Sequence, residues 1–287
     1  MQEINWDKVK VRCSGIGKIM AESRSNPSIT PNQLERLDEL EKKDKLTEKQ
    51  KVEMAELLVK KGNSSKIYLS DTCIEYLMEV YAWETEGMIP IGKEALDLIQ
   101  IKKGKLAEND GIKLLSIVRG NIYRKNTERI SNDFLSGEPD VFQGETLMGC
   151  DAIDDIKLAW DYPIYLKMLQ KPLENSYRMQ IQGYGDITGA TSLHISKCLV
   201  SAPYEIVEDM KWKLIKRMNV LTEESPEFLK EWEVWHKSMI FDHIPPTQRV
   251  NSIKVEPFTP EEKQKIYDRV KYCREWLNNF HQERIKL

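Results

Sequence analysis

Asp155 and Lys157 have the spacing in this chain that most clearly points to chemistry. They lie in the segment from Ile153 to Leu158, a short apolar run that we interpret as a β-strand. Because successive side chains of a strand point to opposite faces, Asp155 and Lys157 should share one face and Ile156 should lie on the other. Charged groups against a core are costly unless they are paired, so this pattern indicates a use for both.

A second carboxylate precedes this strand. Asp140 follows a proline in Gly137-Glu138-Pro139-Asp140, and proline fixes the backbone and interrupts a sheet ladder. Asp140, Asp155 and Lys157 together predict half of a divalent-metal site with a lysine beside it. A buried Asp–Lys–Asp ion-pair network is the alternative, and these three residues alone do not separate the two interpretations.

Two further segments place polar residues on helices. We interpret the segment around 102–117 as one helix with buried Ile112 and Leu115, and Glu108 lies one turn before Ile112, on the inward side. Glu108 is therefore a third metal-site carboxylate, the partner in an ion pair or part of a frayed helix end. A later helix begins near residue 177 and places Gln180 and Tyr184 on one face.

Composition limits the class of protein. With 40% hydrophobic and 31% charged residues among 287, and a net charge of −3, the chain is not a general polyanion binder. Its five cysteines form no Cys-x-x-Cys motif, and its four histidines have no metal-ligand spacing. That pattern predicts a reducing cytoplasm and argues against a zinc ribbon or an iron–sulfur cluster. No apolar run is long enough to span a membrane, and the first ten residues contain no signal-peptide core.

Helix-start signals divide the rest of the chain into elements. Capping boxes begin helices after Thr30 and Thr47, which predicts an antiparallel helical hairpin on the surface. Further N-caps are expected at Ser14, Ser70 and Thr259. Strands are expected at 192–200, in the interior of a sheet, and at 250–255, at its edge.

The order of the polar residues resembles the PD-(D/E)XK nuclease superfamily. Four pieces follow that order: Glu108, Gly137-x-Pro139-Asp140, Asp155-x-Lys157 and Gln180-x-x-x-Tyr184. The chain is most similar to phage exonucleases of the YqaJ viral-recombinase and lambda-exonuclease type, whose N-terminal motif Arg12-x-Ser14 fits. Each piece alone occurs by chance, but four in order are fairly specific. The likeness covers most of the chain, with 27–70 the least similar part, and it departs at the acidic Glu138 and in the glycine-rich Gln–Tyr helix.

This resemblance implies an α/β fold: a restriction-endonuclease-like mixed β-sheet flanked by helices, with an added N-terminal helical hairpin and added C-terminal helices. The sequence contains no repeats and no low-complexity linker. We therefore expect residues 1–287 to form a single nuclease domain with a catalytic core at about 100–203. The helical additions are expected at 27–83 and 204–287.

The resemblance also implies an activity and assigns roles. It implies a Mg²⁺-dependent deoxyribonuclease, with Mn²⁺ as a substitute, that hydrolyses linear duplex DNA from its 5′ end in phage-type recombination or DNA processing. Asp140 and Asp155 would be direct ligands, Glu108 a further ligand, either direct or through a water, and the Ile156 carbonyl would complete the shell. Lys157 would position the attacking water or stabilise the developing charge. Gln180 and Tyr184 would be an accessory pair that orders the site or touches DNA, although packing explains them equally well. Arg12 and Ser14 would bind the terminal 5′-phosphate, or be a surface charge and a helix cap.

Two other functions remain open. One is a RecB-like or restriction-type endonuclease, and the other is a catalytically silent DNA-binding or virion protein on the same fold. DNA is the expected partner, with a single-strand annealing protein and a homo-oligomer as further expectations. No membrane contact is expected, and a phage-encoded protein would work in the host cytoplasm.

Overall fold

The computed structural model describes residues 4–43, 45–64, 66–89 and 98–286. The chain forms two compact units. We call them the helical unit (Met1–Val9, Gly15–Ile89 and Lys265–Leu287) and the sheet unit (Lys10–Ser14 and Pro90–Gln264). The expectation of a single domain with a core at about 100–203 stays a prediction.

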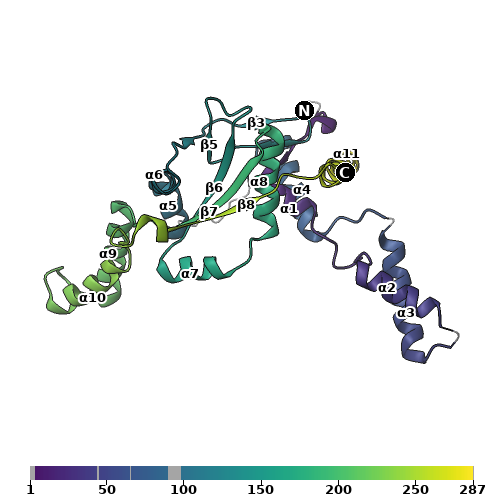
Figure 1. The fold of residues 1–287 in the computed structure, drawn as a ribbon, viewed down its shortest axis with the longest axis horizontal. Helices are drawn as coiled ribbons and strands as arrows, with labels where there is room; N and C mark the ends of the chain where they lie inside the picture. Colours follow the sequence, from purple (N-terminus) through teal and green to yellow (C-terminus); the bar gives the residue numbers. More distant parts are fainter. Residues whose placement is uncertain (1–3, 44, 65, 90–97, 287) are drawn as a thin grey trace. The chain divides into compact units, whose positions relative to one another are not determined.

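The sheet unit is built on five strands in the order β2-β5-β6-β7-β8. Figure 1 labels β5, β6, β7 and β8 of this sheet. In chain order these are β2 (Arg124–Lys125), β5 (Val141–Gln143), β6 (Ala152–Leu158), β7 (Ser192–Cys198) and β8 (Val250–Val255). Strands β6 and β7 pair in parallel, and the other neighbours are antiparallel. This mixed sheet with flanking helices confirms the predicted fold class, including the interior strand near 192 and the edge strand at 250–255.

Helices α6 (Glu108–Arg119) and α8 (Asn175–Thr188) lie against opposite faces of β6. A side-chain carbon added at Gly111 of α6 would meet Ile156 and Leu158, so α6 covers the face with these apolar residues. Side chains of α8 instead contact Asp155 on the other face. The core on the α6 side includes Ile112, Leu115, Tyr123, Val141, Ile156 and Cys198. The period of two in β6 thus separates an apolar face from a polar one.

The helix expected around 102–117 is two helices, which corrects that prediction. Helix α5 (Ile99–Leu106) ends where the Ala107 amide donates to the Lys103 carbonyl, and α6 begins at Glu108. The break places Lys103, only 2% exposed, against the end of β6. Its Nζ donates to the carbonyls of Trp160 at 2.7 Å and Ala159 at 3.2 Å. Ile112 and Leu115 are buried, as predicted.

Other elements of the sheet unit complete this frame. A small second sheet has the order β1-β4-β3, formed by β1 (Val11–Arg12), β4 (Leu135–Gly137) and β3 (Ile130–Ser131). Helix α7 (Tyr162–Gln170) lies in the crossover from β6 to β7 together with α8. Between β7 and β8 the chain forms a pair of neighbouring helices, α9 (Tyr204–Met218) and α10 (Pro226–Lys237) (Figure 1).

The helical unit confirms most of the capping predictions. Its helices are α1 (Ile16–Ile19), α2 (Pro31–Glu41), α3 (Glu48–Ser64), α4 (Asp71–Glu86) and the part of α11 (Pro260–Arg284) from Lys265 onward. Thr30 forms the predicted capping box, Thr47 and Gln50 form another, and Ser70 caps α4. Helices α2 and α3 pack together as the expected hairpin.

The predicted cap at Ser14 is wrong. Gly15 is the residue that precedes α1, no side chain caps that helix, and Ser14 lies in a short 3-10 turn, Cys13–Gly15. A turn of 3-10 helix continues directly into α1, so the geometry in which a serine oxygen accepts from the first helical amides does not arise.

All five cysteines are free and buried. Two of them meet in the helical unit, where the Sγ atoms of Cys73 on α4 and Cys273 on α11 lie 4.0 Å apart. Among the described residues, no helix is both long enough and apolar enough to cross a membrane.

Candidate active site

Asp155 and Lys157 share one face of β6, as the period of two predicts. Lys157 Nζ lies 2.5 Å from Asp155 Oδ2, and the two side chains are 24% and 2% exposed. Burial lowers the pKa of Lys157, but the charge and hydrogen bond of Asp155 and the charge of Asp140 outweigh it, and the net shift is upward. Lys157 is therefore a cation held in a partly buried place by a carboxylate.

Asp140 lies beside this pair. Its Oδ2 accepts a hydrogen bond from the backbone N–H of Ile156 at 3.0 Å, between the two residues of the pair in sequence. The pKa of Asp140 is raised to about 7, mainly by burial and then by the charge of Asp155, against the opposing effects of Lys157 and the Ile156 N–H. The structure thus brings Asp140, Asp155 and Lys157 together, as expected from their order in the sequence.

Glu108 reaches the same region from α6, with a partner of its own. Its Oε2 accepts from Lys125 Nζ at 3.0 Å, and the side chain is 31% exposed. Its charge makes a small contribution to the raised pKa of Asp140. The ion pair predicted as one interpretation of Glu108 is therefore present, and its role as a third metal-site carboxylate stays a prediction.

The carboxylate oxygens of these residues suit a hard divalent cation, but the side chains do not form a complete set of metal ligands. In the part of the chain that the structure describes, no group of three or more His, Cys, Asp or Glu side chains is placed to hold a metal ion. Asp140 is nevertheless a partly buried carboxylate next to another, and such a pair gains from an added positive charge. Oxygen ligands of this kind suit Mg²⁺.

Helix α8 presents a line of polar side chains to this site. Gln180 Nε2 donates to Tyr184 Oη at 2.8 Å and approaches Asp155 Oδ1 at 3.4 Å. Burial raises the pKa of the Tyr184 hydroxyl, which keeps it protonated. One turn earlier, the ring of Tyr177 faces Lys157 with its centroid 4.6 Å from Nζ. Tyr177 was not among the predicted site residues, although its position three before Gln180 was a visible signal.

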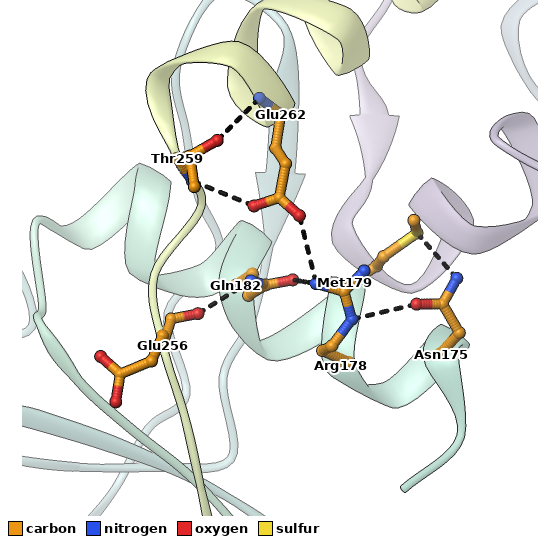
Figure 2. A network of polar contacts seen from close by, with 7 residues as sticks. All are labelled: Asn175, Arg178, Met179, Gln182, Glu256, Thr259 and Glu262. Carbon is orange, nitrogen blue, oxygen red and sulfur yellow. Dashed lines mark hydrogen bonds and ion pairs between the residues drawn. The ribbon is translucent and has the colours of Figure 1, made fainter. Parts of the chain in front are cut away.

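The opposite side of α8 is tied to the chain after β8, as Figure 2 shows. Arg178 donates to Gln182 at 3.1 Å and to Glu262 at 3.4 Å, and Gln182 Nε2 donates to the Glu256 carbonyl at 2.8 Å. Glu262 is itself held by the predicted capping box with Thr259. These bonds fix the rotation of α8 about its axis, and hence where Gln180 and Tyr184 point.

Asp154 does not lie on the face of β6 that carries Asp155 and Lys157. It is fully buried on the α6 side, where Ser196 Oγ donates to its Oδ2 at 2.9 Å and Arg119 lies 3.6 Å away. Burial raises the pKa of Asp154 to about 7, against the effect of Ser196 and Arg119. Of the adjacent aspartates, Asp154 is therefore held within the sheet network and Asp155 faces the site.

Arg12 and Ser14 line a small pocket of the sheet unit together with Arg129, Glu138 and Tyr184. Arg129 also forms an ion pair with Glu138 at 3.3 Å. Tyr184 belongs to both places, because its hydroxyl accepts from Gln180 and its ring lines this pocket. Gly137 makes that approach feasible, since a side-chain carbon there would lie 2.6 Å from the Tyr184 ring.

Comparison with solved structures identifies the fold. The chain is similar to a phage-related exonuclease from Haemophilus somnus 129PT, with 20% identity, a TM-score of 0.58 and coverage of 96% of each chain. It is also similar to an alkaline exonuclease from Laribacter hongkongensis, with 11% identity, a TM-score of 0.53 and coverage of 96% of this chain and 94% of that one. The same enzyme in complex with dAMP matches with a TM-score of 0.52. No protein-family model matches the chain. No curated protein matches it either.

Proposed function

We propose that this protein is a metal-dependent exonuclease that hydrolyses the phosphodiester bonds of linear duplex DNA. The observation that carries the proposal is the meeting of Asp140, Asp155 and Lys157 on one face of the sheet, at the central strand β6, in a fold similar to that of solved exonucleases. Fold alone does not fix activity, so the argument depends on these three side chains.

Phosphodiester hydrolysis requires a nucleophilic water and compensation for negative charge in the transition state. Mg²⁺, with Mn²⁺ as a substitute, would be held by Asp140 and Asp155, with Glu108 and the Ile156 carbonyl as further ligands, and would supply a polarised water and a Lewis acid. Asp140 has to be ionised for this role, and its raised pKa makes binding weaken as the pH falls below about 7.

Lys157 would act on the attacking water or on the charge that develops at the phosphate. Its ammonium is kept protonated by Asp155, and its 24% exposure leaves it accessible to substrate. Gln180 bonds to Tyr184 and lies near Asp155, so in this proposal the two residues keep that carboxylate in its orientation.

The direction of cleavage is the finer part of the proposal. An end-directed enzyme needs a mark that internal DNA lacks, and a terminal 5′-phosphate is such a mark. Arg12 and Ser14, in the pocket that also contains Arg129, offer a cation and a hydroxyl for a phosphate. A role in phage-type recombination, a ring-like homo-oligomer, a single-strand annealing protein as partner and a cytoplasmic location belong to the same proposal.

The test of activity is digestion of an end-labelled linear duplex beside a closed circle, with and without Mg²⁺. We expect loss of the linear duplex only, and a decrease of at least about 100-fold in Asp140→Asn, Asp155→Asn and Lys157→Ala. Asp110→Asn and Lys254→Ala are matched controls on exposed side chains, 55% and 61% exposed, and should cleave like the wild type. A circular dichroism spectrum and melting curve of each variant show that it is folded. Wild-type-like cleavage by Lys157→Ala would contradict the role of that lysine, and cleavage of the circle would favour an endonuclease.

The direction of cleavage has a separate test. Duplexes that differ only in a 5′-phosphate or 5′-hydroxyl are compared with the wild type, Arg12→Ala and Ser14→Ala. We expect the phosphorylated end to be degraded faster by the wild type and this preference to shrink in both variants. Equal rates on both ends would contradict 5′-directed cleavage without affecting the hydrolytic site.

A further inference from the structure

Lys157 is contacted from two sides. Asp155 Oδ2 lies 2.5 Å from Nζ along the same strand, and the ring of Tyr177 lies across it from α8, with its centroid 4.6 Å away. An ammonium over an aromatic face at this distance is within the range of a cation–π contact. The carboxylate alone leaves a long lysine side chain several rotamers, whereas the ring adds a second point of contact.

The placement of Tyr177 follows from α8. Tyr177, Gln180 and Tyr184 lie at i, i+3 and i+7 and therefore share one stripe of the helix. Gln180 in this stripe approaches Asp155, so successive turns of α8 meet the two members of the ion pair. Arg178, on the opposite side of the helix, is bonded to Gln182 and Glu262, and Figure 2 shows how these residues bind the start of α8. The ring is thus carried by a helix whose orientation is fixed.

We propose that Tyr177 is a positioning residue for Lys157: its aromatic face and Asp155 hold the ammonium between them and direct the remaining N–H donors toward the substrate. This inference rests on the proposed nuclease function for its kinetic consequence, but the placement of the ammonium does not depend on that function. The contact needs only the ring, so phenylalanine should replace tyrosine while leucine should not.

The competing role for a tyrosine at 36% exposure is direct contact with DNA, by stacking on a base. The two roles predict different kinetics. A residue that positions Lys157 changes the rate of the chemical step, whereas a residue that only binds DNA changes KM.

The first experiment observes Lys157 itself, without substrate. In protein labelled with ¹³C at the lysine ε-carbon, ring current should shift the Lys157 ε-methylene protons upfield, with Lys157→Ala used to assign the signal. We expect this shift to be retained in Tyr177→Phe and lost in Tyr177→Leu. An unchanged signal in Tyr177→Leu would overturn the proposal whether or not the protein is a nuclease.

The second experiment measures steady-state kinetics on the linear duplex. We expect Tyr177→Leu to lower kcat by about tenfold with KM within about twofold, and Tyr177→Phe to recover most of the loss. Tyr204→Leu, at a tyrosine that is 74% exposed on α9, is the matched control. A rise in KM at unchanged kcat, or no effect of Tyr177→Leu, would overturn the positioning role. Inactivity of the wild type would instead refute the proposed function. The spectroscopic result would still show whether the Tyr177 ring contacts the Lys157 ammonium.

Discussion

Lys103 carries its charge in a place that water hardly reaches. Its Nζ bonds to the carbonyls of Ala159 and Trp160, and the rings of Trp160 and Phe241 lie 5.7 and 5.5 Å from it. Burial lowers the pKa of Lys103 to about 8, although the charge of Asp161 partly opposes this. The free energy of folding therefore depends on whether this lysine is protonated.

The sign of the effect follows from the two states of the chain. The unfolded lysine has a pKa near 10.5 and the folded one near 8, so between these values the unfolded state binds more protons. Stability from this group then rises with pH across that window, by up to roughly 3 kcal/mol, and is lost as the pH falls to 8.

We expect Lys103→Met to remove this rise. The measurement is urea unfolding of the wild type and the variant from pH 7.5 to 10, compared as a difference so that other titrating groups cancel. Lys102→Met, at a neighbouring lysine that is 40% exposed and paired with Asp209, should keep the wild-type slope. Parallel curves for the wild type and Lys103→Met would contradict a buried, titrating Lys103.

Helix α8 needs a glycine where it meets β7. A side-chain carbon at Gly185 would lie 2.8 Å from Leu193 Cδ1 and 3.1 Å from the Ala190 carbonyl oxygen. Leu193 is fully buried and cannot move aside without disturbing the sheet core. The sequence shows this glycine only as a residue that weakens a helix, whereas the structure shows that α8 packs closely against β7 at this position.

Gly185→Ala and Gly104→Ala should therefore have opposite effects. Both glycines are helical, but a side-chain carbon at Gly104 of α5 meets nothing within 4 Å. We expect Gly104→Ala to stabilise by about 0.5–1 kcal/mol through helix propensity, and Gly185→Ala to destabilise by about 1–3 kcal/mol through overpacking. Chemical denaturation measures both. A Gly185→Ala variant as stable as Gly104→Ala would show that α8 can move away from β7.

Across the whole molecule, a feature could be predicted from sequence when the residues that determine it lie close together in the chain. The shared face of Asp155 and Lys157 and the capping boxes at Thr30 and Thr47 depend on residues a few positions apart, and all are confirmed. The Ser14 cap failed although it is local, because the turn before α1 is tighter than the pattern assumed.

Contacts between distant segments could not be predicted in the same way. The ion pair of Lys125 with Glu108 and the bond from the Ile156 amide to Asp140 exist only once α6 and strands β2, β5 and β6 are in place. The position of Tyr177 in the same helical stripe as Gln180 was visible in the sequence, but its contact with Lys157 was not, because Lys157 lies on another element. The order of the polar residues in the sequence predicted most residues of the candidate site. The contacts that hold each of these residues depend on the fold and could not be predicted from that order.

Because every cysteine is buried, the reaction of the wild-type thiols with a reagent measures local unfolding of the chain. Cys13, Cys73, Cys150, Cys198 and Cys273 are each at most 5% exposed, so a thiol reagent such as Ellman's should react slowly with the native protein and with five equivalents after denaturation. The slow phase would measure how often each region unfolds. A single cysteine introduced on the surface would then take a dye selectively, without removal of the native five, and could follow the chain on its substrate.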